Sequence, residues 1–185
     1  MIADVAAIAA WIVKLEDNNY HPGACEDLGD GAGLTRMGIT QRWHSADVPP
    51  EFFTTMPNVQ AYGVAQAFYI SKYCLPLHVP VIDVQVGAPL VSFAVNATPK
   101  IAVETLQQVL DVTVDGAFGP NTLAELLSKD PAIVAKLFQA AWADFYHRDV
   151  ALNPSKAKFL GTPPGPGTKG TGWLGRAGLI YPATL

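Results

Sequence analysis

Charged residues are scarce in this chain. Only 15% of its 185 residues are charged, and 12 lysines and arginines against 16 aspartates and glutamates leave a net charge of −4. No basic run is available to neutralise phosphates, which argues against a nucleic-acid partner, and the acidity removes simple charge attraction to anionic polymers or membranes. Half of the residues are hydrophobic, with 16 glycines and 15 prolines as breaks. We therefore expect a globular chain that forms one compact domain over residues 1–185 and remains monomeric.

Long hydrophobic runs are also lacking. No stretch reaches the roughly 20 apolar residues, uninterrupted by Pro, Gly or charge, that a membrane-spanning helix needs, so no membrane insertion is expected. Residues 1–13 are apolar, but they lack a basic beginning and contain Asp4. We interpret them as part of the mature fold rather than as a signal peptide, and we expect a soluble protein.

Metal-binding patterns are absent from the sequence. Two cysteines, Cys25 and Cys74, cannot build a structural zinc site alone, and no His-Glu-x-x-His pair occurs. The four histidines are far apart in the sequence, at His21, His44, His78 and His147. We expect no metal and no cofactor. Whether the two cysteines pair in a disulfide or stay free thiols is left open by their spacing.

Motifs for several other chemistries are missing as well. There is no Gly-x-Ser-x-Gly elbow for a catalytic serine and no phosphate-binding glycine motif in a strand-to-helix context. Residues 26–31, Glu-Asp-Leu-Gly-Asp-Gly, are acidic, but they lack the acidic spacing and the closing Glu of a calcium loop. Carboxylate chemistry is what these exclusions leave.

Helices dominate the elements that the sequence predicts. Apolar residues at helical spacing, caps and breakers predict a mainly α fold. The predicted helices cover residues 2–16, 40–43, 58–73, 87–97, 100–111, 121–129, a segment beginning at 130–131 and continuing past 145, and 172–180. Residues 18–38 contain five glycines and predict an ordered loop or a small hairpin, while residues 75–83 are expected to be extended or turn-rich, and residues 161–170 a surface loop.

Glu16 ends the first predicted helix beside its apolar face. At about 100° per residue, Val5, Ile8, Ile12 and Leu15 share one face, and Glu16 lies at the edge of that face. Burial raises the pKa of a carboxyl group, so a Glu held there becomes a proton donor near neutral pH. The alternative is a frayed helix end with Glu16 in water. Glycoside cleavage needs such an acid and usually a second carboxylate, for which Asp30 and Asp27 on the following loop are candidates.

Five blocks of the sequence, in order, resemble the glycoside hydrolase family 108 N-acetylmuramidases, which include phage endolysins and secretion-associated muramidases. Residues 13–20 and 33–40 resemble the family's Glu-Gly-Gly-Tyr and Thr-Lys-Tyr-Gly-Ile-Thr signatures. Residues 91–96 are similar to its Phe-Asp-Ala-Ala-Val-Asn helix. Residues 114–123 match Asp-Gly-x-x-Gly-Pro-x-Thr-Leu, and residues 172–176 match Gly-Trp-Leu-x-Arg. Together the blocks extend over nearly the whole chain.

The resemblance implies a lysozyme-like helical fold and cleavage of the MurNAc–GlcNAc linkage of peptidoglycan, with Glu16 as the catalytic acid. It also implies a catalytic half, residues 1–85, and a peptidoglycan-binding-like half, residues 86–185. The implied partner is the glycan strand of the bacterial cell wall. The protein would act in the wall or periplasm after synthesis in the cytoplasm, by an export route that the sequence does not identify.

The sequence departs from the family pattern in three places. Three residues, not two, separate Glu16 from Tyr20, so an alignment anchored on Tyr20 would put Asp17 in the catalytic position. The helical wheel favours Glu16, because Asp17 lies a further 100° or so round the axis, outside the apolar face. The loop after Tyr20 is about four residues longer than the family's usual segment, and Ser92 replaces an acidic residue.

Four residues are candidates for sugar contacts: Tyr20, Thr35, Thr40 and Asn96. Each also has a structural interpretation, since Thr40 could cap the short helix at residues 40–43 and Asn96 could cap the end of its own helix. The tryptophans at 43, 142 and 173 are expected in the core. Two other functions stay open: a lytic transglycosylase, which needs only one acid, and a noncatalytic wall-binding or virion structural protein.

Overall fold

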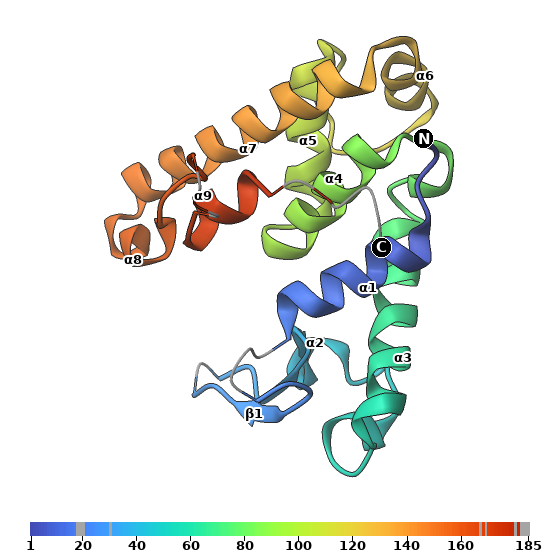
Figure 1. Cartoon of the computed structure of the whole chain (residues 1–185), viewed down its shortest axis with the longest axis vertical. Coiled ribbons are helices and arrows are strands. Elements are labelled where there is room, and N and C mark those ends of the chain that lie inside the picture. Colours follow the sequence, from blue (N-terminus) through green and yellow to red (C-terminus); the bar gives the residue numbers. More distant parts are fainter. Residues whose placement is uncertain (18–20, 30, 167, 169, 180, 182–185) are drawn as a thin grey trace. The chain divides into compact units, whose positions relative to one another are not determined.

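The computed structural model describes the whole chain except residues 18–20, 30, 167, 169, 180 and 182–185. Helices dominate, which confirms the predicted mainly α, lysozyme-like fold with a small hairpin after the first helix (Figure 1). Within the described residues, no helix is both long enough and apolar enough to cross a membrane. The chain divides into two compact units, Asp4–Leu75 and Met1–Ala3 with Pro76–Leu185. The assignment of catalysis and wall binding to residues 1–85 and 86–185 stays a prediction.

The unit of residues 4–75 is built on two helices that pack together, α1 (Val5–Glu16) and α3 (Asn58–Tyr69). α1 begins at Val5 because the Asp4 carboxylate accepts hydrogen bonds from the amides of Ala6 and Ala7. Ile8 and Ile12 are fully buried, as the apolar periodicity predicts. The π-helical segment η2 (Ile70–Cys74) extends α3, so the predicted helix over residues 58–73 is confirmed in extent.

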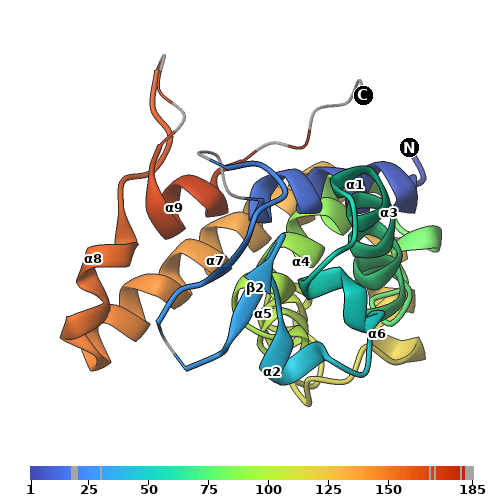
Figure 2. The ribbon, with the colours of Figure 1, turned by 90° about the horizontal axis from the view of Figure 1, so that it is seen from below.

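A three-stranded antiparallel sheet occupies the glycine-rich region between these helices. It contains β1 (Cys25–Asp27), β2 (Leu34–Arg36) and β3 (Ile39–Thr40), in that order. Figure 2 shows α2 (Gln41–His44) directly after the sheet. The 3-10 helix η1 (Pro50–Phe53) packs on β2.

The N-cap position of α2 is Thr40, as predicted, but the Thr40 side chain makes no capping hydrogen bond. The expectation that Trp43 belongs to the core is wrong: its side chain is 67% exposed, with the Arg42 guanidinium 4.9 Å from its ring centroid. α2 has four residues and none of them is buried, so it has no inward face on which Trp43 could pack.

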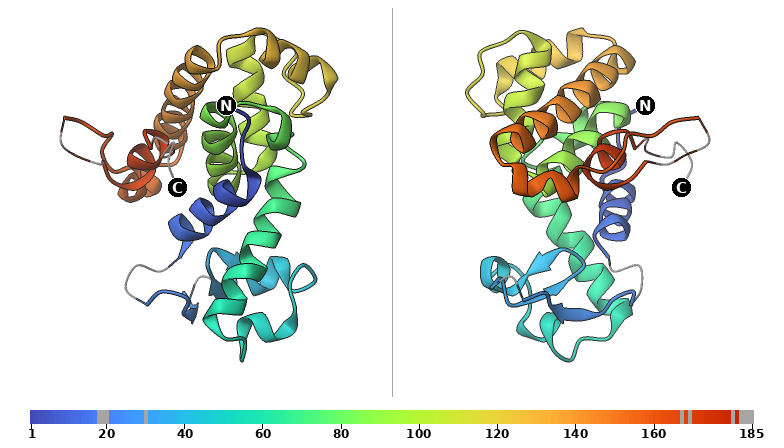
Figure 3. Two further views of the ribbon diagram at one scale, coloured as in Figure 1. Left: turned by 45° about the vertical axis from the view of Figure 1, so that its right-hand side comes forward. Right: turned by 90° about the vertical axis from the view of Figure 1, so that its left-hand side faces the viewer.

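The second unit is a helical bundle. Its helices are α4 (Val84–Asn96), α5 (Pro99–Leu110), α6 (Pro120–Ser128), α7 (Pro131–Leu152), α8 (Ala157–Leu160) and α9 (Gly172–Ala177), with short 3-10 turns η3 (Val79–Val81) and η4 (Pro154–Lys156). α4, α5 and α7 pack on one another, and Figure 3 shows α8 and α9 beside the C-terminal part of α7. Trp142 of α7 is 1% exposed and stacks on Phe93 of α4, which confirms it as a core residue.

Several helix ends in this unit differ from the predictions. α4 begins at Val84, three residues early, because Asp83 caps it by accepting from the Gln85 amide. α6 begins at Pro120 after Gly119, since proline at the first helical position needs no amide partner. Residues 75–83 are turn-rich, as expected, and Ile2 forms an isolated antiparallel bridge with Asp83.

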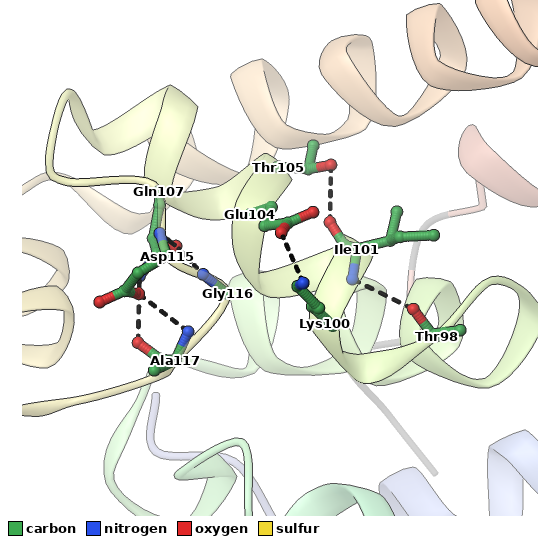
Figure 4. Close-up of polar contacts among 9 residues, drawn as sticks. All are labelled: Thr98, Lys100, Ile101, Glu104, Thr105, Gln107, Asp115, Gly116 and Ala117. Atoms are coloured by element: carbon green, nitrogen blue, oxygen red, sulfur yellow. Dashed lines mark hydrogen bonds and ion pairs between the residues drawn. The ribbon is translucent and has the colours of Figure 1, made fainter.

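The chain turns at Asp115-Gly116, and one buried side chain fixes this turn. Gln107 of α5 is 1% exposed; its carbonyl oxygen accepts from the Asp115 and Gly116 amides at 3.0 and 2.9 Å. Its amide nitrogen donates to the Asp115 carboxylate and the Ala117 carbonyl (Figure 4). It also donates to the Thr122 hydroxyl at 3.1 Å. Hydrogen bonding from the Ala117 amide and from Gln107 lowers the pKa of Asp115.

Replacing Gln107 by leucine should destabilise the protein. The partly exposed polar groups of the turn and the buried Thr122 hydroxyl would lose their partner, which costs about 1–3 kcal/mol of unfolding free energy. The matched control is Gln108→Leu on the same helix, an exposed position expected to change stability by less than about 0.5 kcal/mol. Chemical denaturation measures both. Equal stability of the two variants would contradict the role given to Gln107.

Candidate functional site

Glu16 is the last residue of α1 and is half-buried, with one carboxyl oxygen inaccessible to solvent. The carboxylate is therefore held in the structure rather than released into water at a frayed helix end. Burial raises the pKa of the Tyr73 phenol, and the nearby charge of Glu16 raises it further. This is the location that the helical wheel predicts for Glu16, at the edge of a buried face.

The turn between β2 and β3 packs directly on Glu16. Gly38 has φ +76°, and a Cβ atom placed on it would lie 2.8 Å from the Glu16 Cβ and 2.7 Å from the Tyr69 hydroxyl. No side chain fits at these distances without displacing a neighbour. Tyr69 is 1% exposed and donates from its hydroxyl to the Met37 carbonyl at 2.8 Å, which anchors the turn. Gly38 thus allows the hairpin to approach the stem of Glu16.

Asp17 forms structural hydrogen bonds with both oxygens of its carboxylate. One carboxylate oxygen accepts from the Gly23 amide at 2.8 Å, and the other accepts from the Tyr62 hydroxyl. Asp17 therefore ties the segment after α1 to α3. The hydrogen bond to Asp17, followed by burial, raises the pKa of Tyr62 to about 12.

Arg36 is a buried residue with several hydrogen-bond partners, and the sequence pattern does not identify it as such. It is 5% exposed and donates to three backbone carbonyls: Gly23 at 2.8 Å, Phe52 at 2.7 Å and Met56 at 3.0 Å. A further donation reaches the Asn58 side chain at 2.6 Å. The sequence shows only that Arg36 lies among mostly apolar residues. That pattern does not tell whether the arginine side chain is buried or exposed.

The strand register places Glu26, Thr35 and Thr40 side by side. Glu26 pairs with Thr35 across β1 and β2, and Thr35 pairs with Thr40 across β2 and β3. Because side chains alternate along strands, these three occupy one face of the sheet, opposite the buried Arg36 and Ile39. All three are half-buried. The Thr35 hydroxyl is buried and makes no hydrogen bond to any residue that the structure describes.

The other sequence candidates fall in different places. Asp27 is exposed, and its carboxylate accepts from the Gly29 amide at 2.9 Å within a turn. Tyr20 and Asp30 lie outside the described residues. Asn96 ends α4 in the second unit, is exposed, and accepts a hydrogen bond from the Tyr146 hydroxyl instead of capping the helix through its side chain.

Cys25 and Cys74 are free thiols, which answers the question that their spacing left open. The Cys25 thiol donates to the Phe53 carbonyl at 3.2 Å, and burial raises its pKa. Burial also raises the pKa of Cys74 to about 12, so neither is an activated nucleophile. In the described part of the chain, no three side chains of His, Cys, Asp or Glu gather as a possible metal site.

Comparison with known proteins finds a likeness among solved structures. No protein-family model matches the chain, and no curated protein matches it. Among solved structures, SagA of Brucella abortus superposes with a TM-score of 0.59 at 20% sequence identity, covering 84% of this chain and 90% of SagA. The two chains share a fold. At this identity the likeness to SagA establishes the architecture, while the chemistry has to be argued from the residues.

The contact between Gly38 and Glu16 can be tested by adding one methyl group. Gly38→Ala should lower the unfolding free energy by about 2–4 kcal/mol, the sum of a left-handed backbone cost and overpacking against Glu16. Gly29→Ala is the matched control, because Gly29 also has positive φ (+71°) but has no atom within 4 Å of the added Cβ. It should show the backbone cost alone. Equal losses in the two variants would show that Gly38 does not crowd Glu16.

The hydrogen bond between Asp17 and Tyr62 predicts that the stability of the folded protein depends on pH. The pKa of Tyr62 in the folded protein, about 12, exceeds the value near 10 of an unfolded tyrosine. The stabilisation is therefore complete below about pH 10 and is lost as pH rises through the folded pKa. Ultraviolet absorbance titration, differenced against Tyr62→Phe, should show this late-titrating phenol. Asp17→Asn should return it toward 10, and an unchanged titration in Asp17→Asn would contradict the tie.

Proposed function

We propose that this protein is a glycoside hydrolase of the bacterial cell wall, cleaving the MurNAc–GlcNAc linkage of peptidoglycan with Glu16 as general acid. The observation that carries the proposal is the half-buried Glu16 carboxyl, held at the end of α1 against the β2–β3 turn. The five family-like blocks and the fold shared with SagA support it. The proposed partner is the glycan strand, reached by a monomeric protein acting in the cell wall.

Glu16 is a better acid candidate than Asp17. Both oxygens of Asp17 are used in holding the Gly23 backbone and the Tyr62 hydroxyl, which suits a structural role. Glu16 would donate its proton to the glycosidic oxygen as the bond from that oxygen to the anomeric carbon breaks. A water molecule would add its oxygen to the anomeric carbon and give up a proton to a base.

The base is best sought on the polar face of the sheet. Glu26 shares that face with Thr35 and Thr40, whereas the Asp27 carboxylate accepts from the backbone within its own turn. We therefore place Glu26 before Asp27 as the second carboxylate and keep Asp30, the earlier sequence candidate, in the test. The Thr35 and Thr40 hydroxyls would contact the sugar or the attacking water, and Tyr20 remains a proposed sugar contact.

Digestion of purified peptidoglycan tests these roles. Glu16→Gln should reduce the rate by at least about 100-fold without changing the unfolding free energy much, because only the transferable proton is removed. Glu26→Gln should also lose activity. The matched control is Asp27→Asn, which keeps the turn hydrogen bond and should stay close to wild type. Asp30→Asn is assayed in parallel. Full activity of Glu16→Gln, with loss in Asp17→Asn, would transfer the acid role to Asp17.

Product masses separate the competing activities. Reducing muramic acid ends are expected for hydrolysis. 1,6-Anhydro ends would instead identify a lytic transglycosylase, in which a hydroxyl of the sugar replaces water as nucleophile. Binding to intact cell walls without release of any product would identify a noncatalytic wall-binding protein and overturn the proposal.

A further inference from the structure

The last turn of α1, which carries Glu16, ends without a glycine cap. Asp17 follows it in an extended conformation, with φ −76° and ψ 148°, and the Asp17 amide donates to the Val13 carbonyl at 2.9 Å. The last turn of a helix opens more easily than its middle. An acid at such an end needs further contacts to keep a fixed position, since a displacement of about 1 Å can cost about 100-fold in rate.

The Asp17 carboxylate supplies such contacts. One oxygen accepts from the hydroxyl of Tyr62, a residue of α3, the helix on which α1 packs. Both side chains are half-buried, where a hydrogen bond to a carboxylate is stronger than in water. The pKa of Tyr62, raised to about 12, keeps the phenol a donor at neutral pH. The end of α1 is therefore attached to α3 by a bond that does not belong to the helix backbone.

The peptide groups of Gly23 extend this connection to the sheet. The Gly23 N–H donates to Asp17 at 2.8 Å, and the Gly23 carbonyl accepts from Nε of the buried Arg36 on β2 at 2.8 Å. Gly23 has φ +76°, and a Cβ atom placed on it would lie 2.5 Å from the Asn58 side chain, so this close approach requires glycine. Thr35, the neighbour of Arg36 on β2, belongs to the polar face of the sheet. Asp17 thus connects the end of α1 with the strand that carries a proposed sugar contact.

We propose that Asp17 and Tyr62 are positioning residues for the reaction at Glu16. They act through the backbone of α1, because Asp17 is bonded directly to Glu16 and its carboxylate is fixed to α3 and to the segment that Arg36 holds. Without these hydrogen bonds the last turn of α1 opens more often, and the Glu16 carboxyl spends less time in place against the β2–β3 turn. Neither residue transfers a proton. The inference rests on the proposed function for the reaction, whereas the hold on the helix end is measured without it.

Steady-state digestion of soluble peptidoglycan fragments separates positioning from proton transfer. Asp17→Ala should lower kcat by about 10- to 100-fold and change KM by less than about twofold, because fragments still bind while Glu16 is less often in place. Tyr62→Phe, which keeps the bond to Gly23, should lower kcat by about three- to tenfold. Asp17→Asn should stay within about threefold of wild type, since its amide accepts from Gly23 and donates to the Tyr62 hydroxyl. A loss in Asp17→Asn as large as that in Asp17→Ala would overturn the inference.

Amide hydrogen exchange in the full chain tests the hold on the helix end directly. The amides of Leu15 and Glu16 should exchange about tenfold faster in Asp17→Ala, because opening of the last turn is a local event that this variant favours. Tyr62→Phe should accelerate the same two amides by a smaller factor. Unchanged exchange in Asp17→Ala would overturn the inference even if wild type digests peptidoglycan.

Asp4→Ala is the matched control, because Asp4 caps the other end of the same helix by accepting from two backbone amides of the first turn. Loss of this cap should lower the unfolding free energy, while kcat and the exchange of the last turn stay as in wild type. An equal drop in kcat in Asp4→Ala and Asp17→Ala would show a general loss of stability and overturn the inference. If wild type releases no product but the last turn exchanges faster in Asp17→Ala and Tyr62→Phe alone, the hold on Glu16 stands and the proposed hydrolysis fails.

Discussion

The buried guanidinium of Arg36 is the interaction on which the Glu16-bearing unit depends. A fully charged group at 5% exposure is tolerated only when its N–H donors are satisfied, and here three backbone carbonyls and the Asn58 side chain accept from it. These acceptors lie in the loop after α1, in and after η1, and at the start of α3. One side chain therefore fixes the short sheet to segments that have little regular structure of their own.

The orientation of Arg36 also decides which face of the sheet carries polar chemistry. Because neighbouring side chains alternate, Arg36 and Ile39 on the buried face require Thr35 and Thr40 on the opposite one, with Glu26 beside them. The turn that follows Arg36 approaches Glu16 through Gly38. A buried arginine, a glycine turn and a helix-terminal carboxylate thus form one arrangement, in which Glu16 and the polar strand face are positioned by the same contacts.

The bundle of the second unit uses the same principle with neutral groups. Gln107 of α5 satisfies the backbone of the Asp115 turn, and Ser92 of α4 accepts from Arg176 of α9, so this turn and this short helix are each held by a buried polar side chain. The apolar core then needs only to bring α4, α5 and α7 together. The hydrogen bonds at Ser92 also hold α9 against α4.

The sequence by itself determined the helical class, most helix positions and the placement of Glu16, because helical periodicity and end caps are local properties that depend on residues within a few turns. Tertiary structure decided the rest. It engaged Asp17 with Tyr62 and Gly23, put Glu26 instead of Asp27 beside Thr35, and left Trp43 exposed. These outcomes depend on strand register and on contacting residues that are tens of positions away in the sequence. A register shift of one residue moves every side chain of a strand to the other face of the sheet, although the strand's own sequence is unchanged.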